Sequence, residues 1–287
     1  MHSSNLHITQ LPAISAIYFG LLTSGYDYSH FERNDSHVAM LNSFRNAMPP
    51  HPFFLQTRQG TCDVYPFWPR AAMLETATFY LADNYENWQN REAFRQDILQ
   101  AVNITNPERD ESFWMWIDHF PDVMQHIMSS PHFTDYLQWE QRWILAQNQL
   151  HTESLYLIEK TLHRCQDLYH SSVHDIQLVL NPVKCVYSAD YHLVDKHFVF
   201  TSGRMQTESV IHEFLHHVVH PYVSSHREDI MLHPCRFPGL DDSYYSAGHE
   251  YAFEEYLVRR LTQLASENSL PRNLPAFLCQ LLYEHAP

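Results

Sequence analysis

The sequence predicts an α+β protein that is mainly helical, and three observations lead to this class. Long stretches before residue 170 carry apolar residues at the i, i+3, i+4, i+7 spacing of amphipathic helices. Three short stretches between residues 176 and 201 are instead rich in β-branched and aromatic residues, as strands are. Only 6 of the 287 residues are glycine, against 17 tyrosines and 17 phenylalanines, which indicates bulky helical packing rather than a turn-rich β protein.

Residues 1–170 are expected to form a helical N-terminal domain. The apolar run at residues 11–22 predicts a buried first helix, because it is too short to span a bilayer and no Lys or Arg precedes it. Residues 48–69 contain five prolines and predict an irregular connection. Four further helices are predicted by their apolar spacing, at residues 70–84, 90–102, 112–128 and 133–169.

Residues 171–287 are expected to form a second domain with a small antiparallel sheet. Its strands are predicted at residues 176–180, 184–187 and 197–201. After the sheet come helices at residues 208–220 and 248–261, a continuation of the second helix to residue 269, and a last helix at residues 276–285. A long connection rich in Pro, Ser, His and Tyr joins the first two helices, and connections of this length are usually functional or mobile.

The helix at residues 208–220 contains the motif His-Glu-x-x-His, formed by His212, Glu213 and His216. Its apolar residues form one stripe, and the two histidines, four positions apart, project side by side next to that stripe. Two imidazoles and a carboxylate on one helical turn are typical of a zinc site, in which the glutamate holds a water rather than the ion. Pro221 predicts the end of this helix, because the residue before a proline disfavours helical geometry.

The helix at residues 248–261 is expected to supply a third ligand. A catalytic zinc site usually has three protein ligands and leaves a fourth position for water. Glu250 and Glu254 share the face that carries Leu257 and Leu261, where a carboxylate is costly unless it pairs or binds a cation. Glu250 is therefore predicted as the third ligand, and Glu254 as the acceptor of the free N–H of a ligating histidine.

His-Glu-x-x-His followed by Glu-x-x-x-Glu resembles the pattern of the gluzincin metallopeptidases, and the resemblance covers residues 176–266. It implies a zincin-like C-terminal domain and a hydrolase that cuts peptide bonds in a peptide or protein substrate. It also implies one zinc ion and a zinc-bound water activated by a glutamate. The family's site residues correspond here to the ligands His212, His216 and Glu250, the general base Glu213, and the histidine-orienting residue Glu254.

The resemblance implies roles for two further parts of the chain. The strand at residues 197–201 would be the edge strand that pairs with an extended substrate, since an exposed edge offers free backbone groups. A zinc peptidase also needs a donor that stabilises the oxyanion, typically His or Tyr. Tyr245 and His233, in the connection between the two helices, are the candidates. His249 stands where the family usually has an asparagine.

Two alternatives remain open from the sequence. An aspzincin-type peptidase would use Asp242 as third ligand, because the residues around it match that family's motif in part. A catalytically inactive zincin-fold binding protein would instead hold a structural zinc, closed by a fourth ligand such as His220, Cys235 or Asp242. The metzincin pattern is excluded, since Val219 and Tyr222 occupy the positions of its glycine and third histidine.

The composition excludes some classes of partner and predicts the compartment of the protein. The formal charge of −15 argues against nucleic acid and anionic membranes as partners, because both require a basic surface. The five cysteines are scattered and show no Cys-x-x-Cys pair, so reduced thiols are expected rather than disulfides. Together with the absence of a targeting pattern before the first apolar run, this predicts a cytoplasmic protein.

Overall fold

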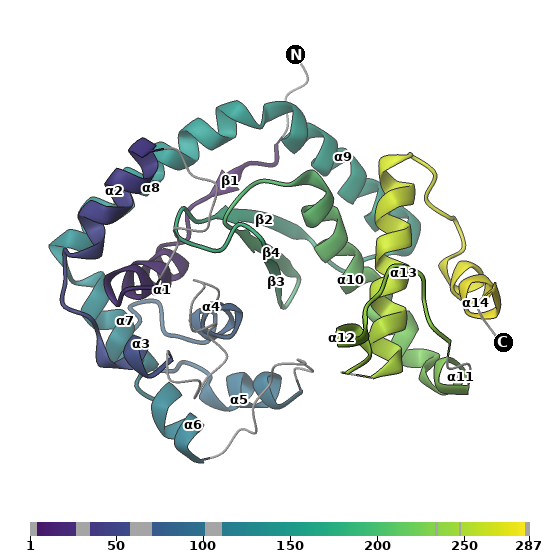
Figure 1. Ribbon diagram of the computed structural model, residues 1–287, viewed down its shortest axis with the longest axis horizontal. Helices are drawn as coiled ribbons and strands as arrows, with labels where there is room; N and C mark the ends of the chain where they lie inside the picture. The colour runs from purple at the N-terminus through teal and green to yellow at the C-terminus, as the bar shows by residue number, and fades with distance from the viewer. Residues whose placement is uncertain are drawn as a thin grey trace.

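The computed structural model describes residues 5–26, 35–57, 71–100, 111–232, 235–246 and 248–284, apart from the side chains of residues 35, 36, 99 and 100 (Figure 1). Helices dominate and accompany one small sheet, so the predicted α+β, mainly helical class is confirmed. The helices before residue 170 are α1 (Pro12–Thr23), α2 (Asp35–Arg45), α3 (Pro52–Thr57), α4 (Ala72–Thr78), α5 (Arg91–Gln100), α6 (Glu111–Ile117), α7 (Phe120–Met128), α8 (Pro131–Leu150) and α9 (Thr152–Tyr169). Those after it are α10 (Thr207–Ser225), α11 (Arg227–Leu232), α12 (Asp242–Tyr245), α13 (His249–Ser266) and α14 (Leu274–Glu284).

The sheet has the strand order β1-β2-β4-β3 and is mixed, so the predicted antiparallel sheet is wrong in its pairing. The strands are β1 (Ile8–Thr9), β2 (Asp175–Leu180), β3 (Ala189–Val194) and β4 (His197–Ser202). β1 pairs with β2, and β2 with β4, in parallel, whereas β3 and β4 form an antiparallel hairpin. β4 therefore lies inside the sheet, and the edges are β1 and β3 rather than the predicted strand at residues 197–201.

Residues 184–187, predicted as a strand, form turns instead. The Asn181 side chain accepts hydrogen bonds from the amides of Val183 and Lys184, at 2.8 and 3.2 Å. An asparagine that binds the backbone two residues on makes a turn, and this one ends β2. The chain then crosses under Gly203, where an added Cβ would lie 2.2 Å from the Lys184 carbonyl oxygen, so only glycine fits this crossing.

Two hydrophobic clusters lie on opposite faces of the sheet. Alternate residues of a strand point to opposite faces, and Val179 and Val199 join a cluster with the helices from α1 to α8. Leu178 and Phe200 join the other cluster, with α9, α10, α13 and α14. α8 contributes to both clusters, so the predicted division at residue 170 stays a prediction.

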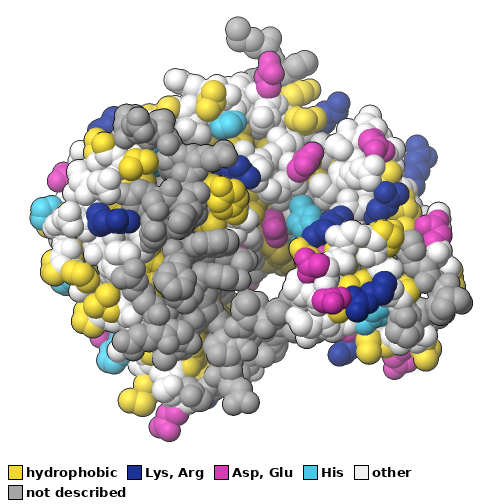
Figure 2. Space-filling view, in the orientation of Figure 1, with side chains coloured by type: hydrophobic (Ala, Val, Ile, Leu, Met, Phe, Trp, Pro, Cys, Tyr) yellow, Lys and Arg dark blue, Asp and Glu magenta, His cyan; other side chains and the backbone are white. Residues whose placement is uncertain are grey.

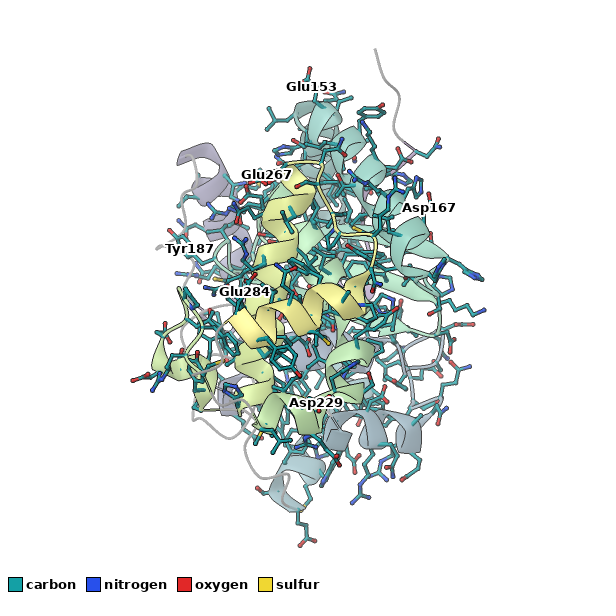
Figure 3. The ribbon with its side chains drawn as sticks, turned by 90° about the vertical axis from the view of Figure 1, so that its right-hand side faces the viewer. Glu153, Asp167, Tyr187, Asp229, Glu267 and Glu284 are labelled. Atoms are coloured by element: carbon teal, nitrogen blue, oxygen red, sulfur yellow. The ribbon has the colours of Figure 1, made fainter. Side chains whose placement is uncertain are left out.

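The first helix confirms the prediction of a buried element, since every residue of α1 from Ala13 to Thr23 is buried. A helix that is apolar on all sides belongs in a core. α8 and α9 form an arc over the sheet (Figure 1), and α14 crosses the outer side of α13 (Figure 3). Among the described helices, none combines the length and the apolar composition that a membrane crossing requires.

Several predicted helix boundaries are wrong, and local contacts explain where. The helix predicted at residues 112–128 is divided into α6 and α7, because Pro121 begins a new helix in its first turn. The helix predicted at residues 133–169 is divided at His151, just after Asn148 binds both backbone groups of Ile8 and fixes the end of α8 to β1. The helix predicted from residue 70 begins at Ala72 and ends at Thr78.

Pro221 lies inside α10 and does not end it, so the predicted boundary there is wrong. A proline removes one backbone hydrogen bond from a helix and crowds the preceding turn. Val219 and Val223, on either side of the proline, are buried in the cluster that contains α9, α10, α13 and α14. Their burial stabilises the helix where this hydrogen bond is missing. The connection that follows is not structureless, since it contains α11 and α12.

Glu140 on α8 gives a prediction about stability. Its carboxyl group is buried and accepts hydrogen bonds from Gln10, Ser15 and Asn181 at 2.6, 2.6 and 2.7 Å. These donors are neutral, so burial prevails and raises the pKa of Glu140 from 4.5 to about 7. Between these two values the folded chain retains a proton that the unfolded chain releases, so this group's contribution to stability falls as the pH rises.

Glu140→Gln is therefore expected to gain stability relative to the wild type by about 2–3 kcal/mol between pH 4.5 and pH 8. Glutamine keeps the shape of the protonated acid and has no charge to bury. Urea unfolding of both proteins at the two pH values measures this difference. A difference between the two proteins that stays constant with pH would contradict the raised pKa.

Candidate metal centre

The site is built where α10 packs against α13. Val210, Ile211, Phe214, Leu215 and Val218 bury one side of α10. This leaves His212 and His216, four residues apart, half-buried on the side that faces α13. On α13, Leu257 and Leu261 are buried and hold the helix in the core. Glu254 and Glu255, about one turn before Leu257, extend toward α10.

Three side-chain atoms converge on one point between these helices. The two Nε2 atoms of His212 and His216 lie 3.2 Å apart. Glu255 Oε2 lies 3.6 Å from the first and 3.4 Å from the second. These atoms form a nearly regular triangle, and this group can hold a metal ion.

The triangle has the size that a small tetrahedral ion requires. Bonds of about 2.0–2.1 Å at tetrahedral angles separate the ligand atoms by roughly 3.3–3.4 Å. All three atoms can act as acceptors, and acceptors face one another at these distances only when a proton or a metal ion lies between them. The donor set therefore fits a divalent cation bound by two imidazoles and one carboxylate.

Glu254 fixes the orientation of His216. Its Oε1 accepts a hydrogen bond from His216 Nδ1 at 2.9 Å, and its Oε2 accepts one from His220 Nδ1 at 2.9 Å. With the proton on Nδ1, the lone pair of the neutral imidazole lies on Nε2 and points at the centre of the triangle. Burial disfavours the charged form of His216, but hydrogen bonds to Glu254 and Glu255 prevail and raise its pKa to about 10. A metal ion would therefore take the place of the proton on Nε2.

Glu255 remains a carboxylate at neutral pH. Burial would raise its pKa, but hydrogen bonds with His212 and His216 outweigh burial and hold the pKa below its ordinary value. Arg259 adds to this effect, since its Nε donates to Glu255 Oε1 at 2.6 Å. The second oxygen, Oε2, is the one that faces the imidazoles.

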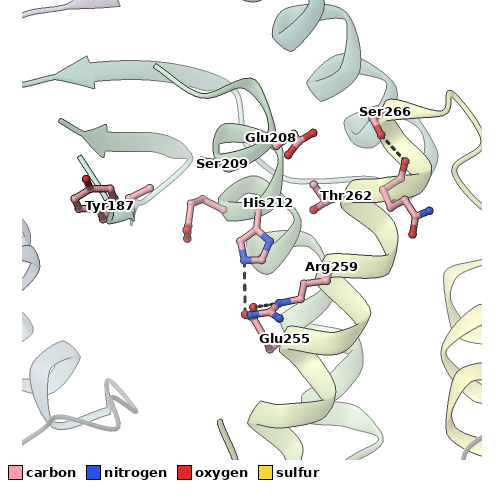
Figure 4. A pocket seen from close by; sticks show the side chains of 11 residues that line it. Tyr187, Glu208, Ser209, His212, Glu255, Arg259, Thr262 and Ser266 are labelled. Carbon is pink, nitrogen blue, oxygen red and sulfur yellow. Dashed lines mark hydrogen bonds and ion pairs between the residues drawn. The ribbon is translucent and has the colours of Figure 1, made fainter. Parts of the chain in front are cut away.

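A cavity of about 570 Å³ opens beside the triangle (Figure 4). His212, Glu213 and Glu255 line it, together with Arg259 on α13 and Tyr187 on the opposite side. On the face shown in Figure 2, charged and histidine side chains gather over the part of the molecule that Figure 1 assigns to α10, α12 and α13. The triangle is therefore open on the side that a water or a ligand would approach.

Glu213 lines this cavity and holds no hydrogen bond within the described residues. Burial raises the pKa of Glu213 above its ordinary value, and the nearby His216 and His212 act in the opposite direction. A half-buried carboxylate with unused oxygens next to a cation site can accept a proton from a bound water.

The remaining predicted residues do not join the triangle. Glu250, the predicted third ligand, lies in the first turn of α13 and pairs with Arg227, whose Nε is 2.6 Å from Glu250 Oε2. Glu255 takes the place predicted for Glu250, because α10 crosses α13 more than one turn beyond its start. The Tyr245 hydroxyl accepts from the Phe237 amide at 2.7 Å and is not among the described residues that line the cavity.

The residues proposed for the alternative sites also lie elsewhere. Asp242 is exposed and pairs with Arg236. His220 turns its Nδ1 to Glu254 rather than to the triangle, and neither it nor Cys235 belongs to the metal-binding group found in the described part of the chain. His233 lies outside the described residues.

Glu255, Arg259 and Tyr191 were not among the residues predicted from the sequence. Glu255 and Arg259 are four apart, the spacing of a helical ion pair, and this was the available signal. Tyr191 on β3 stacks on His216, with ring centroids 6.5 Å apart and planes 12° from parallel. No local pattern marks it, because the contact depends on how β3 passes α10.

The geometry defines an α+β protein with an open His-His-Glu group, and comparison with known proteins adds no closer assignment. No family model, curated protein or solved structure matches this chain. The function is therefore argued from the site alone.

Proposed function

We propose that this chain is a zinc-dependent metallopeptidase of the gluzincin type, with Glu255 rather than Glu250 as its third ligand. The observation that carries the proposal is the His212, His216 and Glu255 triangle, open to a cavity that Glu213 also lines. Two imidazoles and one carboxylate with a free fourth position are the ligand set of hydrolytic zinc sites. Within the described residues no fourth side chain closes the site, which favours catalysis over a structural zinc.

The chain's own residues would divide the work as follows. When bound, zinc would supply a Lewis acid that makes water acidic and polarises a carbonyl group. Glu213 would take a proton from the water at its carboxylate and pass it to the leaving amine. Glu254 would hold the His216 ring in the tautomer whose Nε2 faces the site.

A peptide substrate is supported by the strand next to the site. β3 is an edge of the sheet, and Ala189 at its start lines the cavity together with Tyr187. The edge of a sheet can pair with an extended peptide through backbone hydrogen bonds. These contacts support β3, instead of residues 197–201, as the strand that would bind the substrate.

The zinc content of purified variants tests the ligand set. Wild type, Glu250→Ala and Asp242→Ala are each expected to hold about one zinc, and Glu255→Ala to lose it, because among these three acids only Glu255 faces the Nε2 atoms of His212 and His216. Elemental analysis with circular dichroism as a folding control measures this. Zinc lost with Glu250→Ala and kept with Glu255→Ala would assign the ligand to Glu250. A wild type that takes up no zinc would reject the proposed function.

A further inference from the structure

We propose that Arg259 is a positioning residue that presents a single oxygen of Glu255 to the metal and ties this ligand to residues 239–244. The inference rests on the proposed function and deepens it, because it concerns how the same site is held ready for its ion. It is carried by four contacts of the Arg259 side chain, one with Glu255 and three with Gly239 and Tyr244.

The first contact divides the two oxygens of Glu255. Arg259 Nε binds Oε1 at 2.6 Å, and Oε2 is left facing the imidazoles of His212 and His216 at 3.6 and 3.4 Å. A charge-assisted hydrogen bond of this length is among the stronger contacts in proteins. The carboxylate is thereby held for binding through one oxygen and hindered from rotating to offer both.

The other contacts hold the guanidinium itself in place. Its Nη1 donates to the Gly239 carbonyl at 2.9 Å, and its Nη2 donates to the Tyr244 hydroxyl at 2.7 Å. The guanidinium carbon also lies 4.9 Å from the centre of the Tyr244 ring, within the range of a cation–π contact. Gly239 has φ of +80°, a turn conformation that favours glycine and directs its carbonyl to this position.

These contacts distinguish Arg259 from an ordinary surface ion pair. An isolated pair at i, i+4 contributes little, because both side chains are mobile in water. Here the guanidinium of Arg259 is held by Gly239 and Tyr244 while it binds Glu255. The orientation of the Glu255 carboxylate therefore depends on the segment around α12. Metal binding and the order of residues 239–244 should therefore be linked in both directions, since coupling between two sites is reciprocal.

The test is zinc affinity, measured by competition with a chromophoric chelator for the full-length variants. Arg259→Met is expected to bind zinc about 10–100-fold more weakly than the wild type, as for other residues that hold a ligand. Arg259→Lys keeps the charge but not the fork of donors, so it should recover only part of the loss. Arg260→Met is the matched control, because Arg260 binds Gln263 and does not contact Glu255.

A second readout follows the link to the α12 segment. Zinc is expected to slow amide hydrogen exchange at residues 239–245 in the wild type and to have a smaller effect in Arg259→Met. Zinc affinity in Arg259→Met within twofold of the wild type, with the fold retained, would overturn the positioning role and leave the proposed function intact. A wild type without zinc would instead reject the proposed function itself, so the two failures are distinguishable.

Discussion

Replacing Glu213 by glutamine is expected to lower peptide turnover by about 10²–10⁴-fold, while zinc remains bound. Glutamine has nearly the same shape as glutamate but cannot take a proton from water. Glu213 is not part of the metal-binding triangle, so its loss of charge should leave the three ligands in place. Turnover and zinc content, measured on the same preparation, separate a loss of the base from a loss of the metal.

The structure gives the physical reason why Glu213 is suited to this role. Burial raises its pKa, which makes its carboxylate a stronger base than an exposed one, and no hydrogen bond within the described residues occupies its oxygens. Glu153→Gln is a control for the loss of one acid, because Glu153 is exposed on α9 away from the cavity (Figure 3). Full turnover in Glu213→Gln would reject the mechanism, and loss of zinc in that variant would show that Glu213 also holds the metal.

The motif residues could be predicted because their geometry is local. His212, Glu213 and His216 lie within two turns of one helix, and the spacing alone places the imidazoles side by side. The choice of the third ligand, Glu250 or Glu255, cannot be made from local geometry. It depends on the point at which α13 crosses α10, a tertiary property that no periodicity in either helix contains.

The sheet shows the same limit. β2 and β4 were found from their β-branched and aromatic residues, but their parallel pairing depends on the path of residues 181–196, which connect them. β3 was missed because Asp190 and His192 make it look like a solvent-exposed segment. In the structure both are buried, since a partner for this polar face comes from α4, more than a hundred residues earlier in the chain.

That partner, Glu75, belongs to a fully buried ionic network. Lys184 Nζ donates to Glu75 Oε1 at 2.8 Å and to Asp190 Oδ2 at 2.6 Å. His192 Nε2 lies 2.7 Å from Glu75 Oε2, which also accepts from the Thr201 hydroxyl at 2.6 Å. The network joins α4 to the polar face of β3 and β4, the strands whose other face packs toward the metal site.

Lys184→Met is expected to lower the free energy of unfolding by about 3–5 kcal/mol, because it leaves two buried carboxylates without their cation. Burial disfavours the charge on Lys184, but Asp190 and Glu75 outweigh it and keep its pKa above the ordinary value, so the wild-type network is ionised. Denaturant unfolding at neutral pH measures the loss. Lys196→Met, an exposed lysine in the turn between β3 and β4, should change stability by less than about 0.5 kcal/mol.

A triple variant separates the charge effect from the loss of packing. Lys184→Met combined with Glu75→Gln and Asp190→Asn removes the uncompensated charges and should recover much of the stability, since a buried ion pair is costly mainly when one partner is missing. A loss below about 1 kcal/mol in Lys184→Met would show that the carboxylates find protons or water instead. Because Tyr191 lies between Asp190 and His192 on β3 and stacks on His216, a destabilised network should also loosen the metal site. Zinc affinity should therefore fall in Lys184→Met and return in the triple variant together with stability.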